Sequence, residues 1–377
     1  RALQNRVERL EQRAPQDRSL PDPTVKLSAG RMAETAAGRT DAVAGISQKI
    51  PFPGKRRATA AASTREAEAV ARDLAAMELR IAEQVRSAWW DYYLSSETNR
   101  LTRESRDLLE AVRASVDARV AAGQGNQGDQ LRLANETGQL DKDLADARRM
   151  NATAQARINS LLDRKAGARL PAARLAHLPS TDTLNNLLAR AAVRHPEIEA
   201  AKLRTMAYRH RLTRAKLEKY PDLTVGLTGA DVDSSGLSPV ANGRDQIFGS
   251  LGFNIPFWQE PRRAMIREAE AGIRETAALV GAAEANLQFR VEESWSRASS
   301  SREIITLFQK RLIPDATQAH EVALIAYAAE TAPFNDVIDT WRQLLAYKLQ
   351  LAASRTQLGK ADAALRSAAA LDLPPSR

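Results

Sequence analysis

The stretch Pro221-Asp222-Leu223-Thr224-Val225-Gly226-Leu227 repeats a pattern found earlier in the chain, Pro21-Asp22-Pro23-Thr24-Val25-Lys26-Leu27. Further matches follow in the same order and at nearly the same offset, and chance is a poor explanation for so many. Self-similarity of this kind indicates a duplicated structural unit. The other matching pairs are Ile50-Pro51-Phe52 with Ile255-Pro256-Phe257, Arg56-Arg57-Ala58 with Arg262-Arg263-Ala264, Trp89 with Trp295, and Asp129 with Asp336.

Each copy is predicted to have the same order of elements, which are a helix, two short strands and a long helical hairpin. The fold class is therefore mostly α with a small β part, in two repeats over 1–165 and 166–377. In the first repeat we expect a helix over roughly 2–18, strands over 23–30 and 42–50, and a hairpin over 56–162. In the second we expect a helix over 182–219, strands over 222–230 and 245–255, and a hairpin over 262–368.

The helical hairpins are unusually long. Residues 56–121 contain neither Gly nor Pro, and at about 1.5 Å per residue they predict a helix of roughly 100 Å. Its counterpart runs over about 262–329, where Pro314 predicts a kink or break because proline has no N–H to donate. Such lengths exceed those of ordinary globular helices and indicate coiled-coil packing.

The predicted strands alternate between apolar and other side chains, as Val25 and Leu27 do in the first of them. The connections over 31–41 and 231–244 have the composition of loops. Four strands are too few to close a barrel within one chain and would leave unpaired edges. Three symmetry-related chains would supply about twelve strands and close it, and the same symmetry would join the long helices into a tube.

Composition excludes several classes of protein. The chain has 377 residues, 27% of them charged, with a net charge of +9 and no cysteine. Disulfides, thiolate metal sites and a cysteine nucleophile are thereby excluded. The charges are interspersed along the helices, which argues against nucleic-acid binding. We predict no enzyme activity, cofactor or metal site, because no phosphate loop or catalytic triad is visible and the four histidines (His177, His195, His210 and His320) are scattered.

At this point the sequence resembles the TolC family of outer-membrane efflux proteins over almost its whole length. The resemblance is carried by the duplication, by Pro221-Asp222-Leu223-Thr224-Val225 after the helix that contains His195-Pro196-Glu197, and by the segment from Tyr327 to Asp339. Two first-repeat segments, Pro21-Asp22-Pro23 and Gln48-Lys49-Ile50-Pro51-Phe52-Pro53-Gly54-Lys55, are similar to the heavy-metal branch, the cobalt–zinc–cadmium type.

The resemblance implies a homotrimer in the outer membrane of a Gram-negative bacterium. Its twelve-stranded β-barrel would continue into a long periplasmic α-helical barrel, so that it contacts outer-membrane lipid and lies mostly in the periplasm. It would dock onto a periplasmic adaptor and, through the adaptor, an inner-membrane RND pump, and would conduct heavy-metal cations passively. Because a helical pattern starts at the first residue, we expect the natural N-terminus to lie upstream.

The resemblance also implies roles for particular residues. Asp336 and Asp339, three apart on one helical face, match aspartates that line the closed periplasmic entrance, although acids near a helix start are also favoured by the helix dipole alone. Tyr327 and Asp129 match positions that hold the entrance closed, but Ala332 stands where the family has an arginine. Gly123, Gly125 and Pro333 fit the two hairpin turns that an adaptor would contact, and turn chemistry explains them equally well.

Phe52, Phe257 and Trp258 directly follow the predicted strands and suit an aromatic girdle at the membrane boundary. Trp89, Trp90, Tyr92 and Tyr93 lie mid-way along the first long helix, where packing explains them better than substrate binding.

Two other interpretations compete with the channel. A periplasmic adaptor would have one helical hairpin and β-domains of another kind, and the duplicated order of elements counts against it. A soluble coiled-coil scaffold predicts sustained heptads without alternating strands, and the proline-bounded strands beside each long helix argue otherwise.

Overall fold

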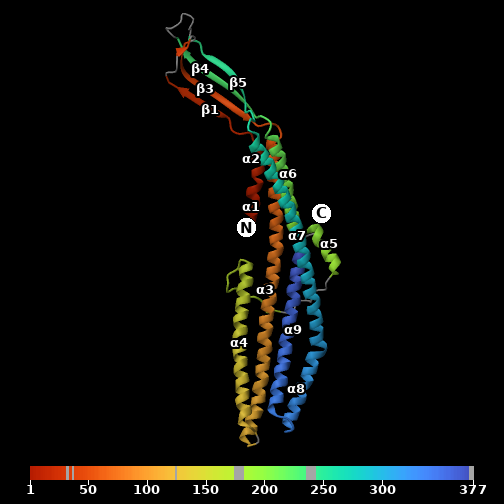
Figure 1. Ribbon diagram of the computed structural model, residues 1–377. Coiled ribbons are helices and arrows are strands. Elements are labelled where there is room, and N and C mark those ends of the chain that lie inside the picture. Colours follow the sequence, from red (N-terminus) through yellow and green to blue (C-terminus); the bar gives the residue numbers. More distant parts are fainter. Residues whose placement is uncertain (31–33, 36–37, 124, 174–181, 235–242, 373–377) are drawn as a thin grey trace. The chain divides into compact units, whose positions relative to one another are not determined.

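The computed structural model describes residues 1–30, 34–35, 38–123, 125–173, 182–234 and 243–372. The chain is mostly helical and has a small antiparallel sheet (Figure 1). Across these ranges, every helix is too short or too polar to cross a lipid bilayer. The chain divides into two compact units, one made of 1–75 with 196–283 and the other of 76–195 with 284–377. Each unit therefore draws on both predicted repeats.

The first unit contains the sheet and the helices that support it. Alanines at the start of the long helix α3 are buried, so that α6 can approach closely, and ion pairs such as Arg72 with Glu199 (3.0 Å) join the two helices. Its elements are α1 (Ala2–Glu11), α2 (Arg13–Arg18), β1 (Thr24–Ala29), β2 (Glu34–Thr35), β3 (Gly38–Ile50), the first part of α3 (Lys55–Ala121), α6 (Pro196–Leu217), β4 (Leu223–Asp233), β5 (Gln246–Phe253) and the first part of α7 (Gln259–Leu307).

The sheet has the strand order β1-β3-β4-β5, and the short β2 pairs with the start of β3 (Figure 1). All pairings are antiparallel. The order places β1 and β5 at the two edges, and each has a single neighbouring strand in the described part of the chain.

The register gathers most of the apolar residues of the four strands on one face of the sheet. Val25 lies opposite Ile46, which lies opposite Leu227, and the rows on either side continue the pattern. Side chains on this face are open to the surroundings, with Leu27 77% and Ile247 78% exposed. The opposite face carries mainly small and polar residues, with Val43 and Phe248 among its apolar members. The apolar face comprises Val25, Leu27, Ala44, Ile46, Ile50, Leu223, Val225, Leu227, Ile247, Leu251 and Phe253.

Two strands are longer than predicted. β3 begins at Gly38 and β4 ends at Asp233, so parts of the predicted loops 31–41 and 231–244 are strand. The β3–β4 ladder runs as far as Arg39 and Asp233, whose side chains form an ion pair at 3.2 Å across the two strands. The remaining predicted loop positions 31–33, 36–37 and 235–242 lie outside the described residues.

The second unit is a set of long helices. The ends of α3, α4, α8 and α9 enclose a core that contains Leu109, Leu133, Phe334 and Trp341 (Figure 1). Its elements are the rest of α3, α4 (Gln127–Leu161), α5 (Leu184–Arg194), the rest of α7, a π-helical turn η1 (Phe308–Leu312), α8 (Ile313–Ala328) and α9 (Phe334–Ala368).

Three helices differ from the prediction. The helix expected over 2–18 is divided at Gln12 into α1 and α2. The helix expected over 182–219 is split into α5 and α6, because Pro196 forces the preceding His195 into an extended conformation with ψ 125°. The break expected at Pro314 takes the form of the π-helical turn η1 just before it. Proline leaves the carbonyl four residues earlier without a donor, and one wider turn accommodates the misfit while the helix continues.

Candidate functional site

The candidate site lies where the turns of the two helical hairpins meet, within the second compact unit. The α3–α4 turn and the α8–α9 turn both line an open cleft of about 490 Å³. Below the cleft lies the apolar core shared by the four helix ends, which fixes the two turns side by side. The sequence-predicted residues Gly125, Asp129, Tyr327 and Pro333 all line this cleft.

The α3–α4 turn depends on its glycines. Gly123 has φ +73°, a left-handed conformation that side chains disfavour. A Cβ on Gly125 would lie 2.8 Å from the backbone nitrogen of Val120, so only glycine fits there. Asn126 then caps α4, because its side-chain oxygen accepts the Gly128 N–H at 2.9 Å. Gln124, between the two glycines, lies outside the described residues.

The α8–α9 turn is built differently. Glu330 takes the left-handed conformation with φ +62°, and the Thr331 N–H then donates back to the Ala326 carbonyl at 2.9 Å. Pro333 follows with an extended backbone and precedes the first residue of α9. A proline in this position costs no helical hydrogen bond, because the first N–H groups of a helix have no intrahelical partner.

Arg119, in the last turn of α3, joins the two turns. Its guanidinium lies 4.9 Å from the centre of the Tyr327 ring, donates to the Tyr327 carbonyl at 3.1 Å, and pairs with Glu330 at 2.9 Å. Tyr327 in turn packs against Phe334, with ring centres 5.2 Å apart. The sequence prediction missed Arg119, whose signal is only that of a basic residue in a last helical turn. The family resemblance implies an arginine at position 332, where this chain has Ala332. Arg119 nevertheless places a guanidinium in the cleft.

Tyr327 and Asp129 face the same cleft without a direct bond, since within the described ranges no hydrogen bond joins them. The two side chains still interact electrostatically. Burial raises the pKa of the Tyr327 hydroxyl, the Asp129 carboxylate raises it further, and Arg119 opposes both. The tyrosine is therefore neutral at physiological pH and can act as a hydrogen-bond donor.

Asp336 and Asp339 lie in the first two turns of α9, and both side chains are exposed. Asp339 is 3.5 Å from Arg342, whose guanidinium also binds Glu136 of α4. The Asp336 carboxylate has no side-chain partner among the residues that the structure describes. The two acids differ in their surroundings, and Asp336 carries the less compensated charge.

We expect Arg119→Ala to loosen the α8–α9 turn by about 1–2 kcal/mol, because it removes a cation–π contact, a hydrogen bond and a solvated ion pair. Hydrogen exchange of the amides over 326–335 should accelerate roughly five- to thirtyfold. Arg132→Ala is the matched control, since Arg132 lines the same cleft and has no bonded partner in the described part of the chain. Equal exchange rates in the two variants would mean that the specific contacts of Arg119 do not stabilise the turn and that only its positive charge matters.

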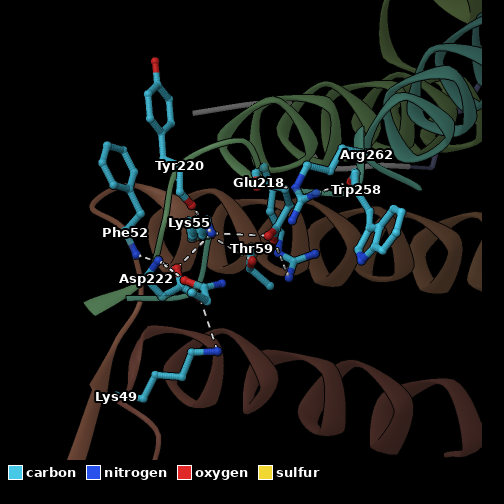
Figure 2. Close-up of polar contacts among 11 residues, drawn as sticks. Lys49, Phe52, Lys55, Thr59, Glu218, Tyr220, Asp222, Trp258 and Arg262 are labelled. Atoms are coloured by element: carbon cyan, nitrogen blue, oxygen red, sulfur yellow. Dashed lines mark hydrogen bonds and ion pairs between the residues drawn. The ribbon is translucent and has the colours of Figure 1, made fainter. Parts of the chain in front are cut away.

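A second cluster of polar residues joins the start of α3 to the start of β4 in the first unit (Figure 2). The Lys55 ammonium is buried and contacts the Asp222 carboxylate at 2.8 Å, the Glu218 carboxylate at 3.3 Å and the Tyr220 carbonyl at 3.0 Å. Buried charges are tolerated only with such partners. The Asp222 carboxylate also accepts the Phe52 N–H at 2.9 Å, so the cluster fixes the direction of the chain as it leaves β3.

The three predicted boundary aromatics fall into two groups. Phe257 and Trp258 are 75% and 74% exposed and pack edge to face with each other. Phe52 is half-buried and stacks on Tyr220, with ring centres 4.4 Å apart (Figure 2). All three lie at the end of the sheet where the strands lead into α3 and α7.

Within the described ranges, no group of three or more His, Cys, Asp or Glu side chains could hold a metal ion. His177 lies outside them.

No protein-family model matches the chain. The cobalt-zinc-cadmium resistance protein CzcC of Cupriavidus metallidurans is 24% identical over 340 residues, which cover 89% of this chain and 78% of CzcC. The outer membrane protein VceC of Vibrio cholerae superposes with a TM-score of 0.80 at 17% identity, over 98% of this chain and 91% of VceC. The outer membrane channel MtrE of Neisseria gonorrhoeae, in its open state, gives 0.79 at 16% identity, over 98% and 85%.

The fold is that of a TolC-type outer-membrane channel. The predicted resemblance to the TolC family is confirmed, and the similarity to CzcC bears out its heavy-metal branch. The prediction of a mostly helical chain with a small β part is confirmed as well.

Proposed function

We propose that this chain is one protomer of a homotrimeric exit duct in the outer membrane of a Gram-negative bacterium. The duct conducts its substrate passively and performs no chemistry. It receives the substrate from an inner-membrane RND pump through a periplasmic adaptor. Heavy-metal cations are the proposed cargo, supported by the name of the relative CzcC, a cobalt-zinc-cadmium resistance protein.

The observation that carries the proposal is the exposed apolar face of the sheet. Burying apolar surface is favourable by about 25 cal/mol per Å², so a strand face on which Leu27, Ile247 and Leu251 are all more than two-thirds exposed needs a cover. The lipid hydrocarbon is such a cover, and alternation of apolar and polar residues is the pattern of strands that span an outer membrane. In a soluble scaffold or a periplasmic adaptor, this apolar face would be exposed to water at a cost in free energy.

The edges of the sheet support the trimer. β1 and β5 would expose unpaired backbone groups, which hydrocarbon does not tolerate. Pairing β1 of one protomer with β5 of the next satisfies both edges, and three copies of four strands close a twelve-stranded barrel. The long helices of the three chains then continue the barrel as a helical tube in the periplasm.

The entrance is proposed to lie at the hairpin turns. Asp336 and Asp339 would form two rings of like charge around a threefold axis and attract cations. Tyr327, Asp129 and Arg119 would hold the turns together in the closed state, and an adaptor would contact Gly123, Gly125 and Pro333. Phe52, Phe257 and Trp258 would mark the membrane boundary at the other end of the helices.

We expect the protein to insert into planar bilayers and give a small cation-selective conductance. Asp336→Asn with Asp339→Asn should lower the cation-to-anion permeability ratio roughly fivefold, since about 1 kcal/mol of attraction is lost near the surface. Asp143→Asn with Asp146→Asn is the matched control, because these acids are also three apart on one exposed helix face but lie within α4.

Each result has a separate meaning. A selectivity unchanged by the Asp336 and Asp339 substitutions would keep the duct and refute the acidic entrance. Well-folded wild-type protein that neither inserts nor conducts would refute the duct.

A further inference from the structure

A basic hollow opens at the junction between β3 and α3, in the first compact unit. It has a volume of about 450 Å³ and is lined by three arginines and by the apolar turn that joins the strand to the helix. Arg18 comes from the end of α2, and Arg56 and Arg57 from the first turn of α3. None of the described residues that line the hollow is acidic. The turn supplies Pro51, Phe52, Pro53 and Gly54.

The three guanidiniums have spare hydrogen-bonding capacity. In the part of the chain that the structure describes, none of the three guanidinium groups pairs with a carboxylate. Arg56 Nη1 donates one hydrogen bond, to the Arg18 carbonyl at 2.7 Å. The neighbouring acids already have their own cations. Asp222 binds Lys49 as well as Lys55 (Figure 2), and Glu218 binds Arg214 as well as Lys55. Within the described ranges, the positive charge of the hollow is therefore not paired with a carboxylate.

These cations lie at a position where the local electrostatic potential is unfavourable to positive charge. The first turn of α3 holds Lys55, Arg56 and Arg57 and no acid, although the positive end of the helix dipole disfavours cations there. The Lys55 N–H donates to the Phe52 carbonyl at 3.1 Å, whereas the Arg56 and Arg57 N–H groups have no backbone partner among the described residues. Such open N–H groups at the start of a helix favour an anion. An anion bound in the hollow would remove the conflict and would meet both the helix end and the arginines.

The corresponding arginine of the second repeat is arranged differently. Arg262, which matches Arg56 in the sequence, turns inward and donates from Nε to the Glu218 carbonyl at 2.9 Å and from Nη1 to the Trp258 carbonyl (Figure 2). Its guanidinium is thus occupied by backbone oxygens. The two junctions share a sequence pattern, yet the matching arginines Arg56 and Arg262 have different partners.

We propose that the hollow binds the phosphate group of an anionic phospholipid at the inner boundary of the outer membrane. This inference rests on the proposed function, which puts β3 across the membrane and Phe52 at its edge. Guanidinium groups bind phosphate oxygens in pairs of hydrogen bonds. Basic pockets beside membrane segments are suited to lipid headgroups, and the two prolines with Phe52 give the apolar wall that the glycerol and upper acyl groups require.

The test uses the full-length protein purified in a neutral detergent and titrated with phosphatidylglycerol, phosphatidylcholine or inorganic phosphate, with bound molecules counted by native mass spectrometry. Wild-type protein should retain phosphatidylglycerol in preference to phosphatidylcholine. Arg18→Ala with Arg57→Ala should weaken phosphatidylglycerol binding by a factor on the order of ten, because each basic residue near a headgroup contributes substantially. Both side chains are exposed, so the fold should be kept.

Arg263→Ala is the matched control, an exposed arginine in the corresponding turn of α7 outside the hollow, and it should leave the binding unchanged. Equal weakening by the control, or none by the double variant, would overturn the proposal. Binding of inorganic phosphate as tight as that of phosphatidylglycerol would also overturn it, in favour of a soluble anion. Conductance measured on the same variants separates the lipid-site hypothesis from the channel hypothesis. Lost preference for phosphatidylglycerol with unaltered conductance would support the lipid site and leave the proposed channel function unaffected.

Discussion

Asp222→Ala is expected to lower the free energy of unfolding by about 3–5 kcal/mol, the largest effect of any single substitution considered. The carboxylate is the partner of the buried Lys55 ammonium and of the Phe52 N–H, and it also lies 3.2 Å from Lys49. Removing it leaves a buried cation whose remaining carboxylate contact, with Glu218, is longer at 3.3 Å. Thermal or denaturant unfolding of the detergent-solubilised protein measures the loss.

Asp22→Ala provides the control, because Asp22 occupies the matching position of the first repeat but is exposed. Its replacement should change stability by less than about 0.5 kcal/mol. Equal effects of the two substitutions would mean that the Asp222 cluster is not what holds the junction.

The Asp222 contribution should also depend on pH. Burial alone would raise the pKa of this carboxyl, but the hydrogen bonds from Lys55, the Phe52 N–H and Lys49 outweigh it and hold the pKa below its ordinary value. A carboxyl whose pKa is lower in the folded than in the unfolded state stabilises the fold at neutral pH. That stability is lost as the pH falls through the folded-state pKa, so the difference between wild type and Asp222→Asn should shrink in strong acid.

Gly359→Ala is expected to destabilise the helical unit by about 2 kcal/mol, although alanine is the better helix former. A Cβ on Gly359 of α9 would overlap the indole ring of Trp90 on α3. The ring is buried and cannot swing away, because it packs edge to face against Trp89 and Tyr93 with ring centres 4.9 Å and 5.5 Å distant. Unfolding of the same detergent-solubilised protein measures the effect.

Gly138→Ala in α4 separates packing from helix propensity. Nothing lies within 4 Å of a Cβ at that position, so the substitution should stabilise the protein by up to about 1 kcal/mol. Opposite signs for the two glycine substitutions are the expected result. A stabilising Gly359→Ala would show that Trp90 is free to move, and the close packing of α3 on α9 would then be wrong.

The packing of Trp90 on Gly359 agrees with the sequence interpretation of the mid-helix aromatics as structural. Tyr92 likewise joins a core with Ala88, Ala154 and Ile158, and its hydroxyl donates to the Pro171 carbonyl at 3.2 Å. These contacts account for the aromatic residues by packing.

Much of this protein was determined by local patterns in the sequence. The absence of Gly and Pro over 56–121 was enough to predict α3 almost to its ends, and alternation predicted the strands. The turns were visible from Gly123, Gly125 and Pro333. These features depend on backbone conformation and on the period of apolar residues, which neighbouring positions specify by themselves.

Other features were decided by the tertiary structure alone. Arg119 meets Tyr327, and Lys55 meets Asp222, only because helices and strands far apart in sequence are packed together. Pro314 predicted a disturbance, but the sequence did not show that the chain would continue through a π-helical turn. Arg56 and Arg262 match in sequence and differ in their partners. A side chain's charge and size are written in the sequence, whereas its partners depend on which surfaces the fold brings within a few ångströms.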